Sequence, residues 1–411
     1  MIYFDASATT PLLPEAREAM VNLMDLSISG NLGNASSLHT AGSRAKGELI
    51  RARTEIAKLI GVPPLELILT SSGSESNNTV LHTFEHCPIF VSAIEHPSVL
   101  RPAEEYGNPC IKVPVNEQGT INLNYLKLKL TEIAKADPKQ KILVSIMLAN
   151  NEIGTVEPIR KVAIIISELR KQGYRNIYLH TDATQAIGKI PVDAKKSMID
   201  YLTFTAHKLG GPIGIAALYV RTGAPFRPLI LGGSQENKRR AGTSNVVLAA
   251  GFAAAAKYSN DNKTWGKYLK IKELRNYLAE RIMQIIPSAR IITPLNNLSS
   301  EHEESALPNI LNVSFPAAEG ESTQLYLDLN GIEVSTGSAC ASGALEPSHV
   351  LMAMFHDAEI AHDSVRFSFN LDTTKQQIDV LLDKIPGIVA KIQDLSTMNK
   401  EPYNERQRMH Q

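Results

Sequence analysis

The chain has 411 residues, 43% of them hydrophobic and 20% charged, a composition typical of a globular protein with two or three domains. Its 42 Lys and Arg residues balance 42 Asp and Glu residues, so it lacks the basic excess that nucleic-acid binding requires. The N-terminal residues have neither a basic region nor an apolar stretch of the kind found in signal peptides, and no apolar run approaches the length of a membrane span. We expect a cytoplasmic protein that acts on a small molecule or on a locally docked protein, without nucleic-acid or membrane partners.

Over about the first 250 residues, strand-like and helix-like segments alternate. The pattern predicts a helix over 43–60 that ends at Gly61, with two prolines just behind it. Short apolar runs, most of them bounded by Gly, Pro, Asn or Asp, predict buried strands at 67–70, 89–94, 142–148, 177–180, 201–204 and 215–220. This alternation favours a mostly parallel sheet covered by helices.

The character of the sequence changes near 251–256. A long helical pattern then ends at Pro287, and more widely separated strands are predicted at 310–315, 331–335 and 364–369. A capping box of Thr373 and Gln376 predicts the start of the last helix. We therefore predict a large domain over 1–255, whose first 14 or so residues can pack on the small domain, a small α+β domain over 256–397 and a flexible tail over 398–411.

The run 201–204 stops abruptly at Thr205, Ala206, His207 and Lys208, followed by a glycine-rich turn. A lysine carried out of a sheet into a desolvated pocket has a lowered pKa and can attack a carbonyl as a free amine. We predict that Lys208 is the covalent anchor of pyridoxal 5′-phosphate. The plain alternative is a solvated lysine at a strand end.

Three other features strengthen this interpretation. Asp182 ends the preceding strand-like run, where a carboxylate could pair with a protonated pyridine nitrogen, or could simply form a turn. His96 follows the run 89–94 and could stack on a flat cofactor or move protons. Gly73 and Ser74 open a helix after the run 67–70, which predicts a phosphate cradle, although Ser- and Gly-rich helix starts are common.

The three cysteines are too few and too scattered for a disulfide framework or a zinc site, and we expect no metal. Cys340 lies among small residues, where a thiol would be reachable and could become a nucleophile, or could merely fill a tight turn. Cys87 and Cys110 sit at the edges of strand-like runs and are expected to be inert, partly buried thiols.

Together these motifs resemble a cysteine desulfurase of the NifS/IscS type, within the class V aminotransferase group of pyridoxal-phosphate enzymes. The resemblance covers nearly the whole chain except about the last fifteen residues. The segments that carry it are 3–10, 33–34, 72–77, 95–96, 150–154, 182–185, 207–208, 240–243, 338–340, 345–348 and 366–368.

The resemblance implies an α/β protein of the PLP-dependent transferase fold type I, with a mostly parallel seven-stranded sheet in the large domain and a smaller α+β domain. It also implies the residues that bind the cofactor: Lys208 as the anchor, Asp182 at the pyridine nitrogen, Gln185 at the phenolic oxygen, His96 over the ring, Asn151 nearby, and Gly73, Ser74, Thr205, His207 and the neighbouring subunit's copy of Thr243 at the phosphate.

The implied substrate is L-cysteine, bound by Asn34, Asn151 and Arg366. Lys208 and His96 would move protons, and Cys340 would take the sulfur as a persulfide and pass it to an acceptor that supplies iron–sulfur clusters or a thio-cofactor or tRNA. The implied assembly is a homodimer that works with a sulfur-acceptor protein.

The sequence departs from the family pattern at two places. Ala35 stands where a proline is usual in the turn after Asn34, and Asn237 stands where an arginine is usual. The tail also lacks the Leu- and Trp-containing end through which housekeeping members dock a scaffold. Two alternatives therefore stay open: another fold-type-I pyridoxal-phosphate enzyme, such as a selenocysteine lyase, and a non-catalytic sulfur-transfer scaffold.

Overall fold

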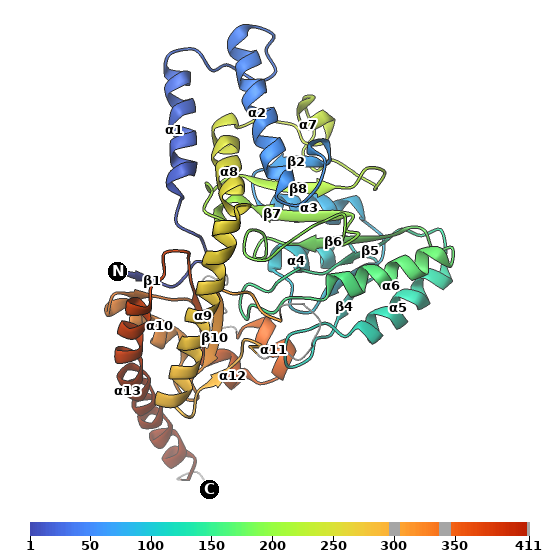
Figure 1. Ribbon diagram of the computed structural model, residues 1–411. Helices are drawn as coiled ribbons and strands as arrows, with labels where there is room; N and C mark the ends of the chain where they lie inside the picture. The colour runs from blue at the N-terminus through green and yellow to red at the C-terminus, as the bar shows by residue number, and fades with distance from the viewer. Residues whose placement is uncertain (296–304, 337–346, 409–411) are drawn as a thin grey trace.

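A seven-stranded sheet organises the larger part of the molecule (Figure 1). The computed structural model describes residues 1–295, 305–336 and 347–408, the last twelve of them by their backbone alone. The strand order is β2-β8-β7-β6-β5-β3-β4. The strands are β2 (Leu67–Thr70), β3 (Ile89–Ser92), β4 (Cys110–Val113), β5 (Ile142–Ser145), β6 (Ile177–Asp182), β7 (Tyr201–Thr205) and β8 (Ala216–Val220).

Only β8 runs against its neighbours in this sheet. It pairs antiparallel with β2 and β7, whereas β7, β6, β5, β3 and β4 pair in parallel. Every residue of β2, β3, β5, β7 and β8 is buried, so these strands read as continuous apolar runs and not as alternating ones. Each buried Ile, Leu or Val side chain contributes about 1.5–3 kcal/mol to folding.

Helices cover both faces of this sheet. The helices α3 (Gly73–Thr83) and α4 (Pro97–Tyr106) share one apolar cluster with one face. The opposite face packs against α5 (Leu123–Ala136), α6 (Ile159–Lys171), α8 (Val246–Ser259) and the C-terminal half of α2 (Thr40–Lys58). Two covered faces are what a mostly parallel sheet requires.

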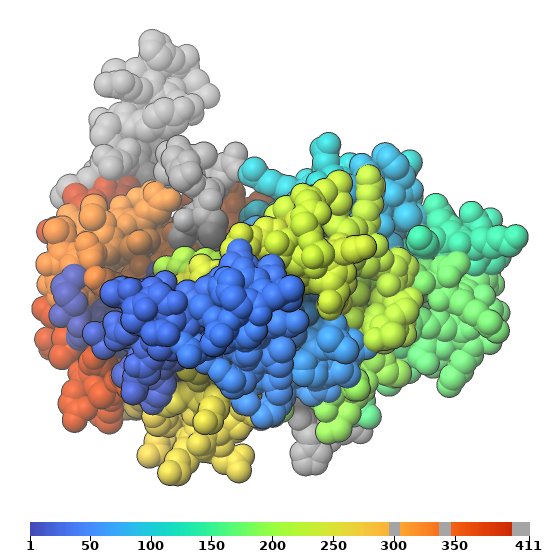
Figure 2. Space-filling model, turned by 90° about the horizontal axis from the view of Figure 1, so that it is seen from above, coloured from blue at the N-terminus to red at the C-terminus, as the bar shows by residue number. Residues whose placement is uncertain are grey.

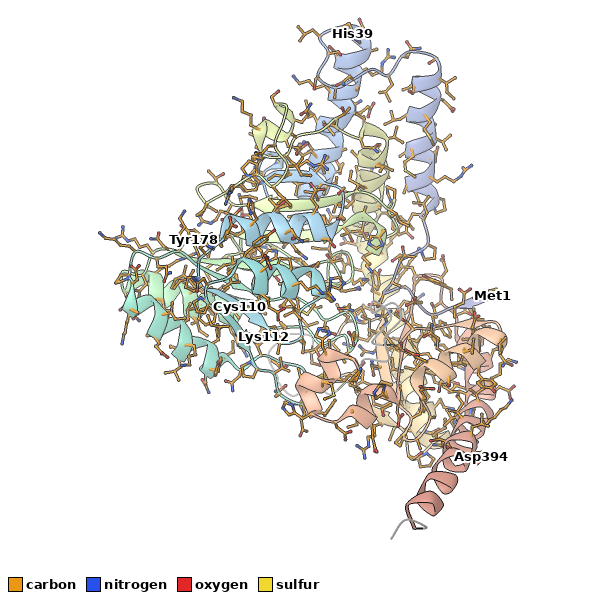
Figure 3. All side chains as sticks on the ribbon, turned by 180° about the vertical axis from the view of Figure 1, so that it is seen from behind. Met1, His39, Cys110, Lys112, Tyr178 and Asp394 are labelled. Carbon is orange, nitrogen blue, oxygen red and sulfur yellow. The ribbon has the colours of Figure 1, made fainter. Side chains whose placement is uncertain are left out.

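The helix α1 (Pro14–Ile28) and the N-terminal half of α2 project from the body as an arm (Figure 1). Figure 2 looks down on this arm, coloured blue, with residues around 230–240 in yellow-green beside it; they include α7 (Gln235–Lys238). His39 caps α2 at the far end of the arm from Met1, accepting from Gly42 N (Figure 3). Both helices pack on α8.

The smaller part of the molecule is built on the long helix α9 (Asn262–Ile285) and α13 (Lys375–Arg408). Its three-stranded sheet has the order β12-β10-β9. The remaining elements are β9 (Arg290–Ile291), β10 (Ile310–Ser314), α10 (Gly320–Leu329), β11 (Ile332–Glu333), α11 (His349–Phe355), α12 (Ala358–His362) and β12 (Ser364–Ser368).

The N-terminus of the chain belongs to this smaller part. Strand β1 (Ile2–Tyr3) pairs in parallel with β11, and Phe4 is buried in the apolar cluster of β10 and β12. A backbone bridge between Asp5 and Ser368 extends the contact. The segment that leads into the large part is thereby tied to the small one.

The predicted fold class is confirmed, and the predicted helix over 43–60 and six strands of the large sheet are present with small changes at their ends. The short edge strand β4 was not predicted. The predicted capping box is wrong by one residue, because Thr374 and Gln377 bond each other's backbone N–H groups at the start of α13. Helix α13 continues to Arg408, into the segment expected to be a flexible tail; the domain limits at 255 and 397 stay predictions.

No helix in the described part of the chain combines the length and the apolar character needed to cross a membrane.

Candidate active site

Three predicted site residues lie at the carboxyl ends of neighbouring strands. Asp182 ends β6, Lys208 ends the short helix η2 (Ala206–Lys208) directly after β7, and His96 follows β3 as the N-cap of α4. Because β3, β5, β6 and β7 are parallel neighbours, these ends meet at one edge of the sheet. Ligands of open α/β sheets bind at this edge.

The Lys208 amine reaches the N-terminal segment of the chain. Its Nζ donates to the carbonyl oxygens of Ser7 and Ala8, the latter at 2.7 Å. Gln185 donates from Nε2 to the same Ser7 carbonyl at 2.9 Å. Backbone carbonyls in the N-terminal segment, residues 3–10, therefore position Lys208. The sequence had pointed to this segment but not to its carbonyls.

A second lysine that the sequence did not reveal as a site residue lies behind Gln185. Lys189 is 3% exposed, and its Nζ donates to Gln185 O at 2.8 Å and to Gln185 Oε1 at 3.2 Å. Burial lowers the pKa of Lys189 to about 7, and the charge of Lys208 acts in the same direction. These contacts fix the Gln185 amide with Nε2 toward Ser7.

The Asp182 carboxylate is 8% exposed and accepts two hydrogen bonds. Thr184 N donates to Oδ1 at 2.9 Å, and Asn77 Nδ2 donates to Oδ2 at 2.8 Å. A carboxylate that accepts two N–H bonds is held in a fixed orientation. Such a group is suited to hold a protonated ring nitrogen.

His96 is held through its Nδ1 atom. Ser98 N donates to Nδ1 at 3.1 Å, and Ser98 Oγ lies 2.8 Å from the same atom. Burial lowers the pKa of His96, the charges of Lys208 and His349 lower it further, and Asp182 opposes them. The ring is therefore biased toward its neutral form.

Gly73 lies beside Thr205 and Thr184 at the start of α3. A Cβ at Gly73 would lie 3.0 Å from Thr205 Cγ2 and 3.7 Å from Thr184 Oγ1. The Thr205 and Thr184 Oγ1 atoms are buried and have no hydrogen-bond partner among the described residues. The N–H groups of Glu75 and Ser76 are bonded to Ser72, so the N–H groups of Gly73 and Ser74 and the two hydroxyls are the donors of a candidate anion site.

His207 neighbours this site. Its Nδ1 lies 3.2 Å from Thr9 Oγ1. Burial, followed by the charges of Lys208 and Lys189, lowers the pKa of His207 to about 4. His207 is therefore neutral near pH 7 and can form hydrogen bonds without adding charge.

Asn34 and Thr243, both predicted site residues, do not lie with the sheet-edge residues of the same chain. Asn34 lies in the turn between α1 and α2, where its Oδ1 accepts from Ser36 N. Thr243 is exposed in the segment before α8. Arg240, three residues earlier, pairs with Glu75 on α3 at 2.8 Å.

The segment that departs from the family pattern at Asn237 is anchored by the preceding residue, Glu236. Glu236 accepts two hydrogen bonds of 2.7 Å from Arg53 and one from Leu69 N. Glu236 and Asn237 both have positive φ angles, 49° and 57°. The bonds of Glu236 therefore hold this turn in place, and they do not involve the side chain at position 237.

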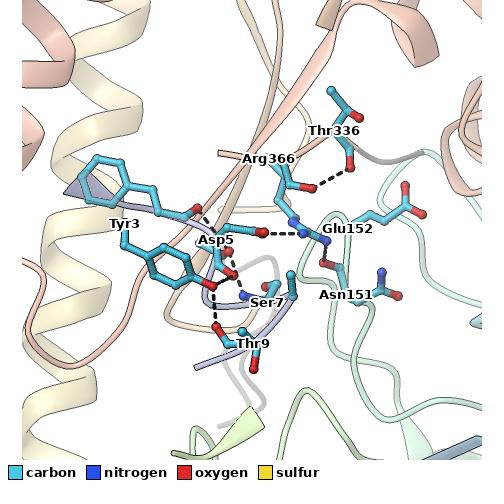
Figure 4. Close-up of polar contacts among 12 residues, drawn as sticks. Tyr3, Asp5, Ser7, Thr9, Asn151, Glu152, Thr336 and Arg366 are labelled. Carbon is cyan, nitrogen blue, oxygen red and sulfur yellow. Dashed lines mark hydrogen bonds and ion pairs between the residues drawn. The ribbon is translucent and has the colours of Figure 1, made fainter. Parts of the chain in front are cut away.

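Arg366 on β12 joins the small part of the molecule to the sheet edge (Figure 4). Its guanidinium donates to Asp5 Oδ1 at 2.8 Å and to Asn151 O at 3.0 Å. The residue is 4% exposed, and its Nε is buried without a partner among the described residues. Asn151 thus accepts the hydrogen bond from Arg366 through its backbone carbonyl oxygen and not through its side-chain amide.

Cys340 lies outside the described residues. The other two thiols, Cys87 and Cys110, are half-buried, and burial raises the pKa of each above its ordinary value. Their thiolates are therefore scarce near neutral pH, as expected of inert cysteines.

Comparison with known proteins defines the class. The aminotransferase class-V family model matches residues 2–381, so the chain belongs to that family. A curated protein of Dictyoglomus turgidum named "Cysteine desulfurase IscS" is 40% identical over 97% of both chains. A solved "NIFS-like protein" has a TM-score of 0.82 at 36% identity, covering 95% of this chain and 99% of that one. "SspA in complex with cysteine" has a TM-score of 0.71 at 28% identity, covering 90% and 99%.

The cofactor of this family is pyridoxal 5′-phosphate, and the residues at the sheet edge fit it. The unpaired Thr205 and Thr184 hydroxyls at Gly73 suit its phosphate. The doubly bonded Asp182 carboxylate suits its pyridine nitrogen. Lys208 lies one strand further along the sheet.

Proposed function

We propose that the protein is a cysteine desulfurase that converts L-cysteine to L-alanine and leaves the sulfur on Cys340. The observation that carries this proposal is the placement of Lys208, Asp182 and His96 at one sheet edge, with Arg366 facing that edge from the small domain. Relatives named as cysteine desulfurases match the chain over nearly its full length.

The cofactor would be held by the large domain. Lys208 would anchor it, Asp182 would hold the pyridine nitrogen, Gln185 would serve the phenolic oxygen and His96 would contact the ring. The phosphate is assigned to Gly73, Ser74, Thr205 and His207, with Asn151 nearby. Bound there, pyridoxal phosphate supplies an electron sink for the charge left when the α-proton of an amino acid departs.

Arg366 would hold the substrate carboxylate, with Asn34 and Asn151 as the other candidates. A guanidinium suits this task because its fork matches a carboxylate in a bidentate contact. In the structure the fork donates to Asp5 Oδ1 and to Asn151 O, and its buried Nε has no partner among the described residues. The substrate would therefore lie between the two domains.

Proton transfer would fall to Lys208 and His96. The Lys208 Nζ is held against two carbonyl oxygens, so its approach to the sheet edge is fixed before substrate arrives. As a free amine, Lys208 could take up the α-proton of the substrate at Nζ. His96, neutral and fixed at Nδ1, can exchange a proton through its other nitrogen.

Cys340 would take the sulfur. Its thiolate attacks the substrate sulfur, an S–S bond forms as the substrate Cβ–S bond breaks, and the bonding electrons stay with the carbon. The carbon takes up a proton and leaves as alanine. In sum, L-cysteine and the Cys340 thiol give L-alanine and a persulfide.

The working unit is proposed to be a homodimer in the cytoplasm. Thr243 is exposed in its own chain, which suits the assignment of its phosphate contact to the neighbouring subunit. A sulfur-acceptor protein would then take sulfur from Cys340 toward iron–sulfur clusters or a thiolated cofactor or tRNA.

The test is an assay of alanine and sulfide from L-cysteine with a reductant. Wild type is expected to form both in equal amounts, and Cys340→Ala is expected to form neither at a comparable rate. No alanine from the wild type would refute the activity. Full turnover by Cys340→Ala would refute the role of this thiol.

A further inference from the structure

Asn77 and Ser98 connect the two groups proposed to flank the cofactor ring. Asn77 Nδ2 donates to Asp182 Oδ2 at 2.8 Å and to Ser98 Oγ at 2.9 Å. Ser98 Oγ lies 2.8 Å from His96 Nδ1. We call Asn77 and Ser98 the Asn77–Ser98 bridge. It joins three elements, because Asn77 is on α3, Ser98 is at the start of α4 and Asp182 ends β6.

The direction of each hydrogen bond in the bridge follows from the groups at its two ends. A carboxylate only accepts, so Asn77 must present an N–H to Asp182. Asn77 is fully buried, and its Oδ1 has no partner among the described residues. The amide therefore has its two N–H groups committed, one to Asp182 and one to Ser98 Oγ.

His96 receives its orientation from Ser98. The Ser98 backbone N–H can only donate, and it points at His96 Nδ1 at 3.1 Å. Ser98 Oγ already accepts from Asn77, so its own proton is available for the same nitrogen. Nδ1 is therefore an acceptor, and the proton of the neutral ring is on Nε2.

We propose that the Asn77–Ser98 bridge makes His96 a neutral imidazole with its proton on Nε2 and links its protonation to the charge of Asp182. Asn77 and Ser98 are positioning residues, since they act through His96 and Asp182. Protonation of His96 would have to occur at Nδ1, against the Ser98 N–H, so the bridge opposes it. His96 then serves as a hydrogen-bond donor at Nε2.

This inference deepens the proposed function, on which its catalytic consequence rests. The other ionisable groups that act on His96 are Asp182 from β6, Lys208 from η2 and His349 from α11. Glu95, the preceding residue, is fully buried, and burial raises its pKa well above the ordinary value, which favours the uncharged form. Asp182 is thus the one carboxylate among these groups that favours imidazolium.

The test uses full-length protein with its cofactor and histidine labelled with ¹⁵N. His96→Gln assigns the His96 signals. In the wild type, Nδ1 is expected to resonate as an unprotonated nitrogen and Nε2 as a protonated one near pH 7. A protonated Nδ1 at that pH would overturn the proposal, whatever the activity.

Asn77→Asp keeps the size of the side chain but replaces the amide by a carboxyl group, which lies at hydrogen-bond distance from Asp182, so the two groups share one proton. The Ser98 hydroxyl can then donate to the new carboxyl group and no longer donates to His96 Nδ1. The NMR midpoint of His96 should rise by about one pH unit or more. The midpoint of the acid limb in the pH dependence of kcat should rise with it. The value of kcat should fall about tenfold, which is less than the complete loss of acid–base catalysis would cost. Asn122→Asp at the N-cap of α5 is the matched control and should change neither quantity.

Ser98 supplies a second pair of variants in case Asn77→Asp does not fold. Ser98→Ala should shift the midpoint in the same direction by less, because the backbone N–H remains, and Ser98→Thr should restore it. Unchanged midpoints in both Asn77→Asp and Ser98→Ala would overturn the proposal. L-Cysteine turnover by the wild type separates this result from a failure of the desulfurase assignment.

Discussion

The cofactor side of the site is built from one sheet, whereas the substrate side joins three segments far apart in the sequence. Asp182, Lys208 and His96 lie at the ends of β6, β7 and β3, which strand pairing brings to one edge, while Ser7 and Ala8 carbonyls outside the sheet also hold Lys208. Arg366 and Asp5 lie in the smaller part of the molecule and meet the larger part at Asn151.

This difference predicts that substitutions can impair the cofactor side and the substrate side of the site separately. Changes at the sheet edge should alter what happens to the cofactor and the protons. Changes at the Arg366 junction should alter the affinity for substrate and leave the cofactor in place. The predictions below run from the largest expected effect to the smallest.

Lys208→Ala should reduce alanine formation by at least about 10³-fold, because it removes both the anchoring amine and the proposed proton carrier. The fold should persist, since the segment of Ser7 and Ala8 that the Nζ contacts is also held by the pairing of β1 with β11 and by the buried Phe4. Alanine formation and the absorbance of bound cofactor measure the effect. Lys171→Ala, an exposed lysine of α6, is the control; near-normal turnover by Lys208→Ala would contradict the assignment.

Arg366→Lys should raise the KM for L-cysteine by roughly 10–100-fold with a smaller change in kcat, because an ammonium cannot make the forked contact. Cofactor content should stay at the wild-type level. Steady-state kinetics and cofactor absorbance measure both. Arg290→Lys on β9 is the matched control, and a loss of cofactor from Arg366→Lys would show that the two sides are not separable.

Lys189→Met should change how stability depends on pH. The amine has a pKa of about 7 in the folded protein and about 10.4 when unfolded, so between these values the unfolded chain binds the extra proton and stability rises with pH. The Met variant has no titrating amine at this position and therefore lacks this pH-dependent contribution to stability. It should exceed the wild type by about 2 kcal/mol near pH 7, after the loss of the bonds to Gln185. Because the lost bonds count at every pH, the difference should shrink as the pH rises and reverse in sign above about pH 9.

Urea unfolding at several pH values checks the Lys189 prediction. The exposed Lys171→Met is its control. A difference that does not vary with pH would contradict the lowered pKa.

Asp5→Asn should have the smallest effect, a fall of about two- to threefold in the KM for L-cysteine. The Asp5 carboxylate bonds Arg366 at 2.8 Å and competes with a substrate carboxylate for it, whereas an amide competes less. Asp328→Asn on α10 is the control. A rise in KM would instead show that Asp5 orients the guanidinium for substrate.

Much of the sheet could be predicted because its strands are short apolar runs with clear ends. Strand β4 was missed because it is a half-buried edge strand that contains the exposed Lys112, next to Cys110 (Figure 3). The capping box was displaced by one residue because Thr373 and Thr374 are adjacent and each is followed three residues later by a glutamine.

The cofactor side was predicted largely from residue types at strand ends. The sequence could not reveal the contacts of Lys208 with Ser7 and Ala8, since backbone carbonyls leave no residue signature. Nor could it reveal the Asn77–Ser98 bridge, whose members are 21 residues apart and meet only through the packing of α3 and α4. On the substrate side, Arg366 was named, but its partner Asp5 is 361 residues away.

The central claim is that this site moves sulfur from L-cysteine to Cys340. The most direct measurement mixes the protein with one equivalent of L-cysteine, without reductant, and determines both the alanine formed and the mass of the Cys340 peptide. The account predicts one alanine for each sulfur atom added to that peptide in the wild type, and little of either in Arg366→Lys at the same concentration. Alanine without added mass on the Cys340 peptide, or no alanine at all, would contradict it.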